Sequence, residues 1–115
     1  MPENNINPTE FGNSLKTNYE LFYDLHLFIA SNDPASDEAH KNLKNICETK
    51  LGKYYELQTT DINKDFLAVI NNGVLVTPTL KITITPEGKP PLKPITIIGT
   101  LSDTQKVLST LLVND

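Results

Sequence analysis

The 115-residue chain has the composition of one compact domain, because 38% of its residues are hydrophobic, enough for a single modest core. Its formal net charge of −4 gives no attraction to phosphate backbones or anionic lipids, so we expect neither nucleic acid nor a membrane as a partner. No apolar run approaches the roughly 20 residues that cross a bilayer, and residues 1–14 are polar where a signal peptide would be apolar. We therefore expect a cytoplasmic protein.

The N-terminal part of the sequence predicts a tail followed by a strand. Residues 1–16 show no apolar rhythm, so we expect a flexible tail ahead of one domain that spans residues 17–115. Tyr19 to Ala30 alternates, with apolar side chains on both sides. This pattern predicts a strand that is buried on both faces and central in its sheet.

A helix is predicted next. Asp33 supplies a side-chain cap and Pro34 a first-turn residue, and the helical spacing continues to about Lys50. The predicted buried face consists of Ala39, Leu43, Ile46, Cys47 and Leu51.

The second half of the chain predicts two further units of sheet and helix. Tyr54 to Thr60 reads as a strand parallel to the first, and Asp65 caps a short helix that Asn72 and Gly73 end. Strands are then expected at 74–85 and 93–98, joined as a long hairpin by a segment rich in turn formers.

A closing helix completes the predicted order. Ser102 and Gln105 have the spacing of a capping box, in which the two side chains satisfy the first backbone N–H groups. The apolar stripe of this helix consists of Val107, Leu108, Leu111 and Leu112. The whole reads βαβαββα, which predicts an α/β, thioredoxin-like single domain.

The position at which thioredoxin-like enzymes carry their thiols holds no cysteine. Redox members place a thiol at the start of the first helix, where the helix dipole lowers its pKa. Here the stretch is Ser31-Asn32-Asp33-Pro34, and the only cysteine, Cys47, falls on the predicted core face. Neither His26 nor His40 has a cysteine or acidic spacing pattern around it that is typical of a metal site. We expect no catalytic residue, metal or cofactor.

Thr77-Pro78 lies where thioredoxin-like folds often hold a cis proline beside a ligand groove. A trans proline at the start of a strand explains the same residues equally well. The sequence leaves both interpretations open.

Several motifs resemble those of the KaiB family of circadian clock proteins, and the resemblance covers about Leu25 to Leu111. These are Ala30-Ser31-Asn32 with Pro34 and Ser36, Leu43-Lys44-Asn45-Ile46, Asp61, Leu75 with Thr77-Pro78-Thr79-Leu80, Ile97-Ile98-Gly99 with Leu101-Ser102-Asp103, and Lys106-Val107-Leu108. The resemblance implies a non-enzymatic protein that binds the hexameric ATPase KaiC. It also implies two folds, a tetrameric resting form and a monomeric thioredoxin-like binding form, with Gly99 and Asp103 at the hinge between them.

The resemblance also implies which residues contact the partner, and the sequence departs from the family there. Contact is expected from the first helix and the second half of the domain, through Glu38, Lys41, Gln58 and Pro78. The positions of Glu38 and Gln58 are expected to be arginine and lysine in clock members, so two positive charges are missing. The segment 81–96 is also longer than the family pattern.

Three functions therefore compete. The first is regulation of a KaiC-type ATPase in a clock or clock-like system. The second is a KaiB-like adaptor in a stress response or in histidine-kinase signalling, which the changed charges at Glu38 and Gln58 favour. The third is a glutathione- or thiol-dependent redox enzyme, which the missing Cys-x-x-Cys disfavours.

The segment that changes between the family's two folds favours strand in this chain. Lys81-Ile82-Thr83-Ile84-Thr85 alternates with β-branched residues, which disfavour helix by roughly 1 to 2 kcal/mol over five residues. An interior proline costs a helix about 3 kcal/mol, and Pro86 to Pro91 holds three. We therefore predict the thioredoxin-like arrangement for the free protein, with 81–85 paired against 95–98.

Overall fold

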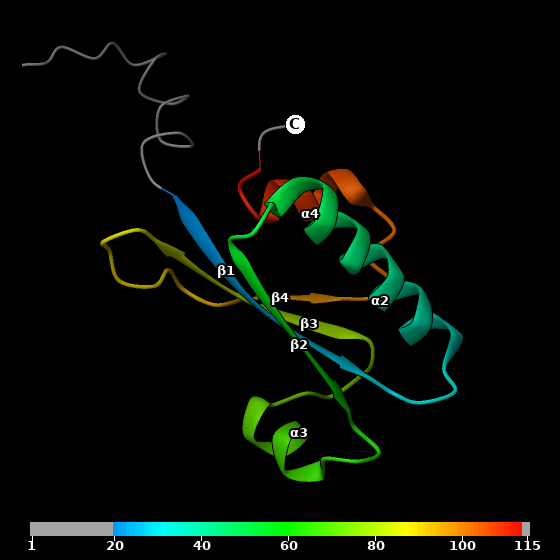
Figure 1. Cartoon of the computed structure of the whole chain (residues 1–115). Helices are drawn as coiled ribbons and strands as arrows, with labels where there is room; N and C mark the ends of the chain where they lie inside the picture. The colour runs from blue at the N-terminus through cyan, green and yellow to red at the C-terminus, as the bar shows by residue number, and fades with distance from the viewer. Residues whose placement is uncertain (1–19, 114–115) are drawn as a thin grey trace, which may run out of the picture.

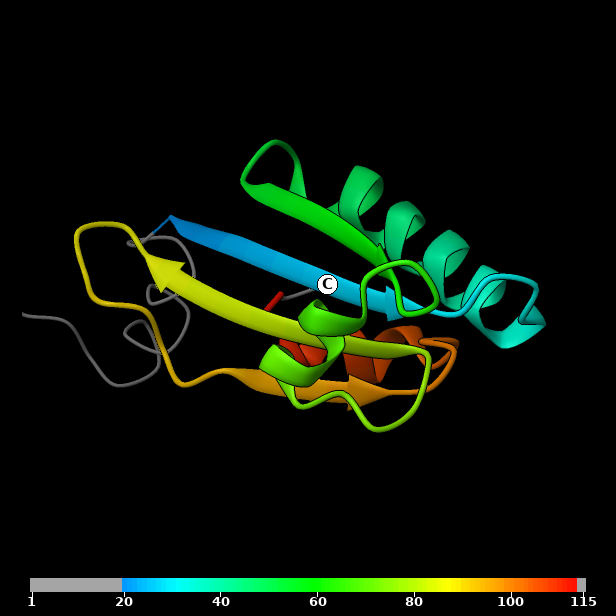
Figure 2. The ribbon, with the colours of Figure 1, turned by 90° about the horizontal axis from the view of Figure 1, so that it is seen from below.

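The computed structural model describes residues 20–113, which form a four-stranded mixed sheet with two helices on one face and a third at one end of the other (Figures 1 and 2). The elements are β1 (Leu21–Ile29), α2 (Pro34–Ile46), the π-helical turn η1 (Cys47–Leu51), β2 (Tyr55–Asp61), α3 (Phe66–Asn72), β3 (Thr79–Pro86), β4 (Ile95–Ile98) and α4 (Thr104–Thr110). The predicted tail at 1–16 lies outside the described residues. No helix between residues 20 and 113 is long and apolar enough to cross a membrane.

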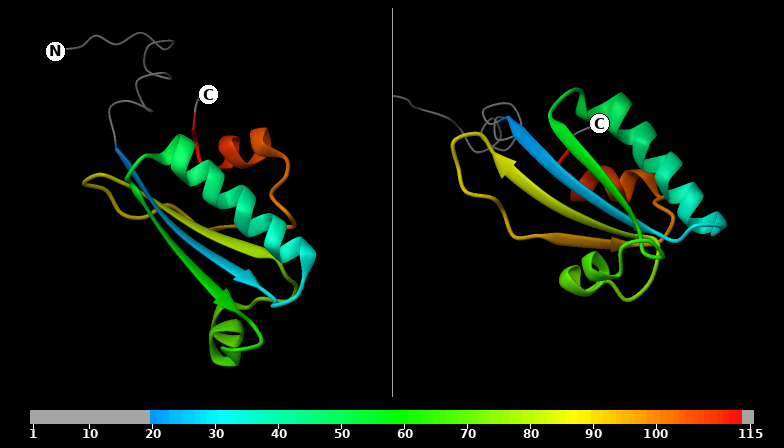
Figure 3. Two further views of the ribbon diagram at one scale, coloured as in Figure 1. Left: turned by 45° about the vertical axis from the view of Figure 1, so that its right-hand side comes forward. Right: turned by 60° about the horizontal axis from the view of Figure 1, so that its bottom comes forward.

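The sheet has the strand order β2-β1-β3-β4. β1 pairs parallel with β2, and β3 pairs antiparallel with both β1 and β4. The predicted βαβαββα order and the central place of β1 are confirmed. Because α2 connects two parallel neighbours, it crosses back over one face of the sheet, and α4 lies beside it on the same face (Figure 3).

Local sequence explains why α2 begins where it does. The Asp33 carboxylate accepts the N–H of Ala35 at 3.2 Å, and Pro34 occupies the first turn. All five residues predicted for its buried face are buried, and η1 carries that face on to Leu51. The helix therefore packs on the sheet along its whole length.

Alternation along β1 and β3 builds the core. The inward residues are Tyr23, Leu25, Leu27, Leu80, Ile82 and Ile84, and they meet the apolar faces of α2 and α4. Burial of both faces of β1 was predicted and is correct only near its end, where Phe28 is fully buried. Phe22 and Asp24 on the same outer face are exposed, because the helix on that side, α3, lies at the end of the sheet (Figure 2).

Two strand predictions were wrong in their limits. β3 begins at Thr79 rather than Val74, because Thr79 already pairs with Phe28 and β1 ends one residue later, leaving 74–78 no strand to pair with. The β3–β4 register joins 79–82 to 95–98, so of the segment 81–85 only Lys81 and Ile82 pair with β4. Proline at 90, 91 and 94 has no N–H for the ladder, which stops it at Ile95.

The cap of α4 was also predicted wrongly. Asp103, not Ser102, is the N-cap, and its carboxylate accepts the N–H of Lys106 at 3.2 Å. The Ser102 hydroxyl accepts instead from the Thr100 hydroxyl at 3.1 Å. Leu112 lies past the end of α4 and is 44% exposed, so it is not part of the buried stripe.

A pair of matched leucines tests this division between core and surface. Leu80 is 0% exposed and Leu75 is 94% exposed. We expect Leu80→Ala to lower the free energy of unfolding by about 2–5 kcal/mol, because the deletion leaves a cavity, and Leu75→Ala by less than about 0.5 kcal/mol. Chemical denaturation of both variants measures the difference, and equal effects would contradict the placement of β3.

Candidate interaction surface

The residues predicted to contact a partner do not form one surface. Glu38 and Lys41 are exposed on α2, on the side of that helix that points away from the sheet. Gln58 pairs in register with His26, which alternates with the inward residues Leu25 and Leu27. Gln58 therefore lies on the opposite face of the sheet from α2. Pro78 is buried, so its ring offers little area to a partner.

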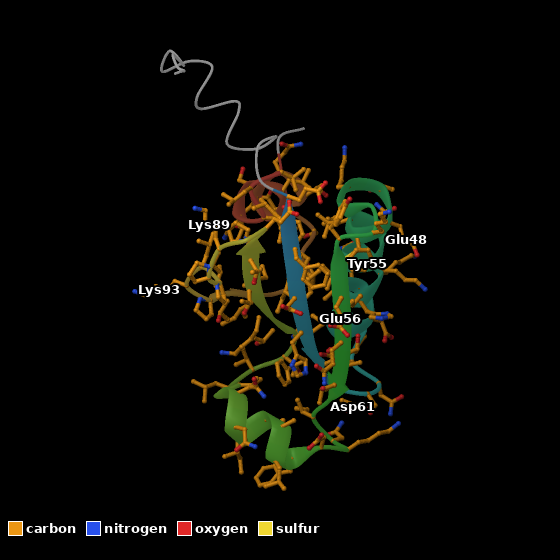
Figure 4. The ribbon with its side chains drawn as sticks, turned by 60° about the vertical axis from the view of Figure 1, so that its left-hand side comes forward. Glu48, Tyr55, Glu56, Asp61, Lys89 and Lys93 are labelled. Carbon is orange, nitrogen blue, oxygen red and sulfur yellow. The ribbon has the colours of Figure 1, made fainter. Side chains whose placement is uncertain are left out.

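Gln58 lines a shallow groove on the helix-poor face, with a volume of ≈ 720 Å³. Its walls come from β1, β2, β3, α3 and Pro94 in the connection between β3 and β4, and the charged side chains along it are Asp24, Glu56 and Lys81. Figure 4 shows Glu56 midway along β2. The groove is thus polar and carries both signs of charge.

A second feature of this end of the molecule was missed by the sequence analysis. Six apolar side chains that are 49–94% exposed come from α3, from the loop after it and from the last residue of β4. They are Phe66, Leu67, Ile70, Leu75, Val76 and Ile98. We call this set the apolar end patch, because the three segments meet at the same end of the sheet (Figures 1 and 2).

The signal for the patch was present in the sequence but could not be interpreted. α3 spans only seven residues and buries none of its side chains. The apolar residues of α3 would form part of the core only if another element covered them. The sequence alone does not show whether such an element lies next to α3, because the fold decides which segments are neighbours. Apolar side chains in such a cluster mark an interaction surface more often than scattered single ones do.

The loop at the empty redox position is tied down by hydrogen bonds. The Ser31 hydroxyl donates to the Asp61 carboxylate at the end of β2, and the N–H of Asn63 donates to it at 3.0 Å. These bonds hold the pKa of Asp61 below its usual value. The Ser36 hydroxyl donates to Asp33 at 2.9 Å and accepts the N–H of Ala30 at 3.0 Å. These polar groups therefore hydrogen-bond to one another and stabilise the loop.

The Thr77–Pro78 peptide bond is cis and leads directly into β3. The Thr79 hydroxyl donates to the carbonyl of Val76 at 2.6 Å, which spans the bend around Pro78. The loop that presents Leu75 and Val76 therefore has a defined shape at the start of β3.

Residues 99–103, which include the two hinge residues implied by the family, carry unusual backbone angles. Gly99 has φ of 117° and the buried Leu101 has φ of 62°, a region that costs a side-chain-bearing residue free energy. The Asn42 side-chain amide of α2 donates to the Thr100 carbonyl at 2.9 Å and links this segment to the helix layer.

Cys47 is buried in the core, and His26 is engaged in a ring stack and a hydrogen bond. Burial, with help from Glu48, raises the pKa of the Cys47 thiol to about 11. His26 stacks on Phe28 with ring centroids 4.0 Å apart and shares a 2.7 Å hydrogen bond with the Thr60 hydroxyl, and desolvation lowers its pKa. Within residues 20–113 no three His, Cys, Asp or Glu side chains gather as a metal site would require.

Comparison with known proteins identifies the family. The KaiB domain family model matches residues 26–113. The chain belongs to the KaiB family. Circadian clock oscillator protein KaiB from Rippkaea orientalis is 41% identical over 91 residues, which cover 79% of this chain and 82% of that protein. KaiB1 from Synechocystis is 42% identical over 90 residues, covering 78% of this chain and 80% of the relative.

Solved structures show the same fold as this KaiB-family chain. A thioredoxin from Plasmodium falciparum superposes with a TM-score of 0.63 at 11% identity, covering 93% of this chain and 83% of that chain. The N-terminal domain of SasA from Synechococcus elongatus superposes with a TM-score of 0.57 at 21% identity, covering 79% and 84%. The thioredoxin-like prediction is confirmed. The relatives that define the family are named as clock proteins and not as enzymes.

Cys47 provides a test of its core position. A pKa raised from an ordinary 9.0 to about 11 lowers the thiolate fraction at pH 8 by about a hundredfold, so iodoacetamide should label the native protein at least that much more slowly than the denatured protein. The raised pKa also means that this thiol stabilises the fold below pH 9 and that the stability falls as the pH rises toward 11. Equal labelling rates in native and denatured protein would contradict the burial of Cys47.

Proposed function

We propose that this KaiB-family protein acts in a clock or clock-like system by binding a KaiC-type hexameric ATPase, and that it catalyses no reaction itself. The observation that supports this proposal is the apolar end patch, six exposed apolar side chains gathered at one end of a small domain. Apolar surface left in water carries a free-energy cost, which contact with a partner removes. We place this activity in the cytoplasm.

The patch extends to the edge of the groove that Gln58 lines, through the neighbouring residues of α3. An interface built there would have an apolar centre and a polar rim, the usual arrangement of protein–protein contacts. Gln58 would contribute to the rim, and Pro78 would act by shaping the loop beneath Leu75 and Val76. Glu38 and Lys41 lie on the other side of the sheet and would contact a different part of the hexamer or a second partner.

The apolar end patch can be tested with matched leucine substitutions. We expect Leu67→Asp to raise the Kd for a purified KaiC-type ATPase by about tenfold or more, because a carboxylate would be desolvated in the contact. Leu112→Asp introduces the same charge at another partly exposed leucine and should change the Kd by less than about twofold. Surface plasmon resonance on the folded variants gives both values, and equal effects would contradict the patch as the contact.

The adaptor role is the second candidate, and the missing positive charges at Glu38 and Gln58 favour it. If a KaiC-type partner binds clock members through their basic side chains at these positions, it would associate more slowly with this chain, which lacks them. Complementary charge mainly raises the association rate. Self-association of the chain remains compatible with either role. A thiol-dependent enzyme is the weakest candidate, because the only thiol is buried with a pKa near 11.

A charge reversal on α2 separates the first two candidates. We expect Glu38→Arg to raise the association rate with a KaiC-type ATPase at low salt, and the gain should shrink as salt screens the charge. Glu48→Arg makes the same reversal further along the helical segment and serves as the control (Figure 4). If neither wild type nor Glu38→Arg binds the ATPase, the adaptor role replaces the first proposal.

A further inference from the structure

The connection between β3 and β4 is longer and richer in proline than a hairpin needs. It runs from residue 87 to residue 94, whereas hairpin loops usually hold about two to five residues. A turn at its start is closed by the N–H of Lys89, which donates to the Pro86 carbonyl at 3.0 Å. Residues 90–94 follow outside any helix or strand, and every residue from 87 to 94 is exposed.

The sequence of this stretch, Lys89-Pro90-Pro91-Leu92-Lys93-Pro94, holds the backbone near the polyproline II conformation. Each proline fixes φ near −65°, and each residue that precedes a proline is restricted to extended angles. Those two rules apply to all six residues except Leu92. Leu92 is fixed in another way, because its N–H donates to the Ile84 carbonyl of β3 at 2.8 Å.

This anchoring involves one of the three edges of the segment. A polyproline II helix has three residues per turn, so residues 91 and 94 share one edge, 90 and 93 share a second, and 89 and 92 share the third. The bond to Ile84 ties the backbone of the third edge to β3, although the Leu92 side chain is still 43% exposed. The Pro91–Pro94 edge and the Pro90–Lys93 edge are exposed as well, and Pro94 also forms part of the wall of the groove that Gln58 lines.

Two lysines give the segment a charge of its own in a chain whose net charge is −4. Figure 4 shows Lys89 and Lys93 at the hairpin connection, with Lys93 projecting away from the sheet. One proline is enough to stop strand pairing at a sheet edge, so three in five residues exceed what edge protection requires.

We propose that Lys89–Pro94 is a docking segment for a partner domain that recognises polyproline II helices. Such a domain has a groove lined by aromatic side chains, into which the Pro90-Pro91 and Lys93-Pro94 pairs would fit, and an acidic side chain at the groove edge would pair with Lys93. Because the prolines already restrict the backbone of this segment before binding, little conformational entropy is lost on binding. Residues 87–91 lie at the end of the hairpin away from α3 (Figure 2), whereas Pro94 reaches the groove that Gln58 and α3 line. None of the six residues of the apolar end patch belongs to this segment, so the proposal stands whether or not that patch binds an ATPase.

Fluorescence titration provides a direct test with the whole protein. An isolated SH3 domain and an isolated WW domain, each with a tryptophan in its peptide groove, serve as probes, and this chain contains no tryptophan to interfere. We expect a saturable change in the fluorescence of at least one probe. The double change Pro91→Ala with Pro94→Ala should weaken that binding by about tenfold or more.

Matched variants show whether binding depends on the prolines and lysine of this segment or on any proline or lysine at the surface. Pro34→Ala removes an exposed proline at the start of α2 and should leave the Kd within about twofold of wild type. Lys93→Glu should weaken binding at low salt more than at high salt, while Lys53→Glu should not. Circular dichroism confirms that each variant is folded. The proposal is overturned if neither probe gives saturable binding, or if the double proline variant binds as tightly as wild type.

Discussion

The fold depends on β1 pairing with a neighbour along both of its edges. It hydrogen-bonds to β2 on one side and to β3 on the other, and its inward side chains form the centre of the core. At one end the hydroxyl of Tyr23 donates to the carbonyl of Leu111 at 2.7 Å, a buried bond that fixes the end of α4 over the strand. Without β1, the strand β2 would have no strand that joins it to the C-terminal hairpin.

The arrangement leaves the two faces of the sheet with different roles. α2 and α4 bury one face, so the residues there serve stability. The opposite face is partly open and presents a polar groove, and the apolar end patch lies at its edge. In a redox enzyme of this fold the chemistry would lie at the loop before α2. In this KaiB-family chain that loop holds no cysteine, and its serine hydroxyls donate to the carboxylates of Asp61 and Asp33, which stabilises the loop.

The C-terminal half shows how local sequence favours strands over helix. Alternation of β-branched residues from 81 to 85 places Ile82 and Ile84 in the core, and the prolines that follow prevent either a helix or a longer ladder. Residues 99–103 join β4 to α4, and in this segment Gly99 and Leu101 have positive φ.

The sequence by itself determined the order of elements, the buried face of α2, including Cys47, and the central place of β1. Each follows from local periodicity or capping, and none needs knowledge of distant contacts. Tertiary structure alone decided the limits of β3 and β4, because pairing ends where the partner strand ends or where proline removes a donor. It also decided that Glu38 and Gln58 lie on opposite sides of the sheet and that the apolar residues of α3 stay uncovered. Those outcomes depend on which segments meet in space, and the spacing of residues along the chain does not contain that information.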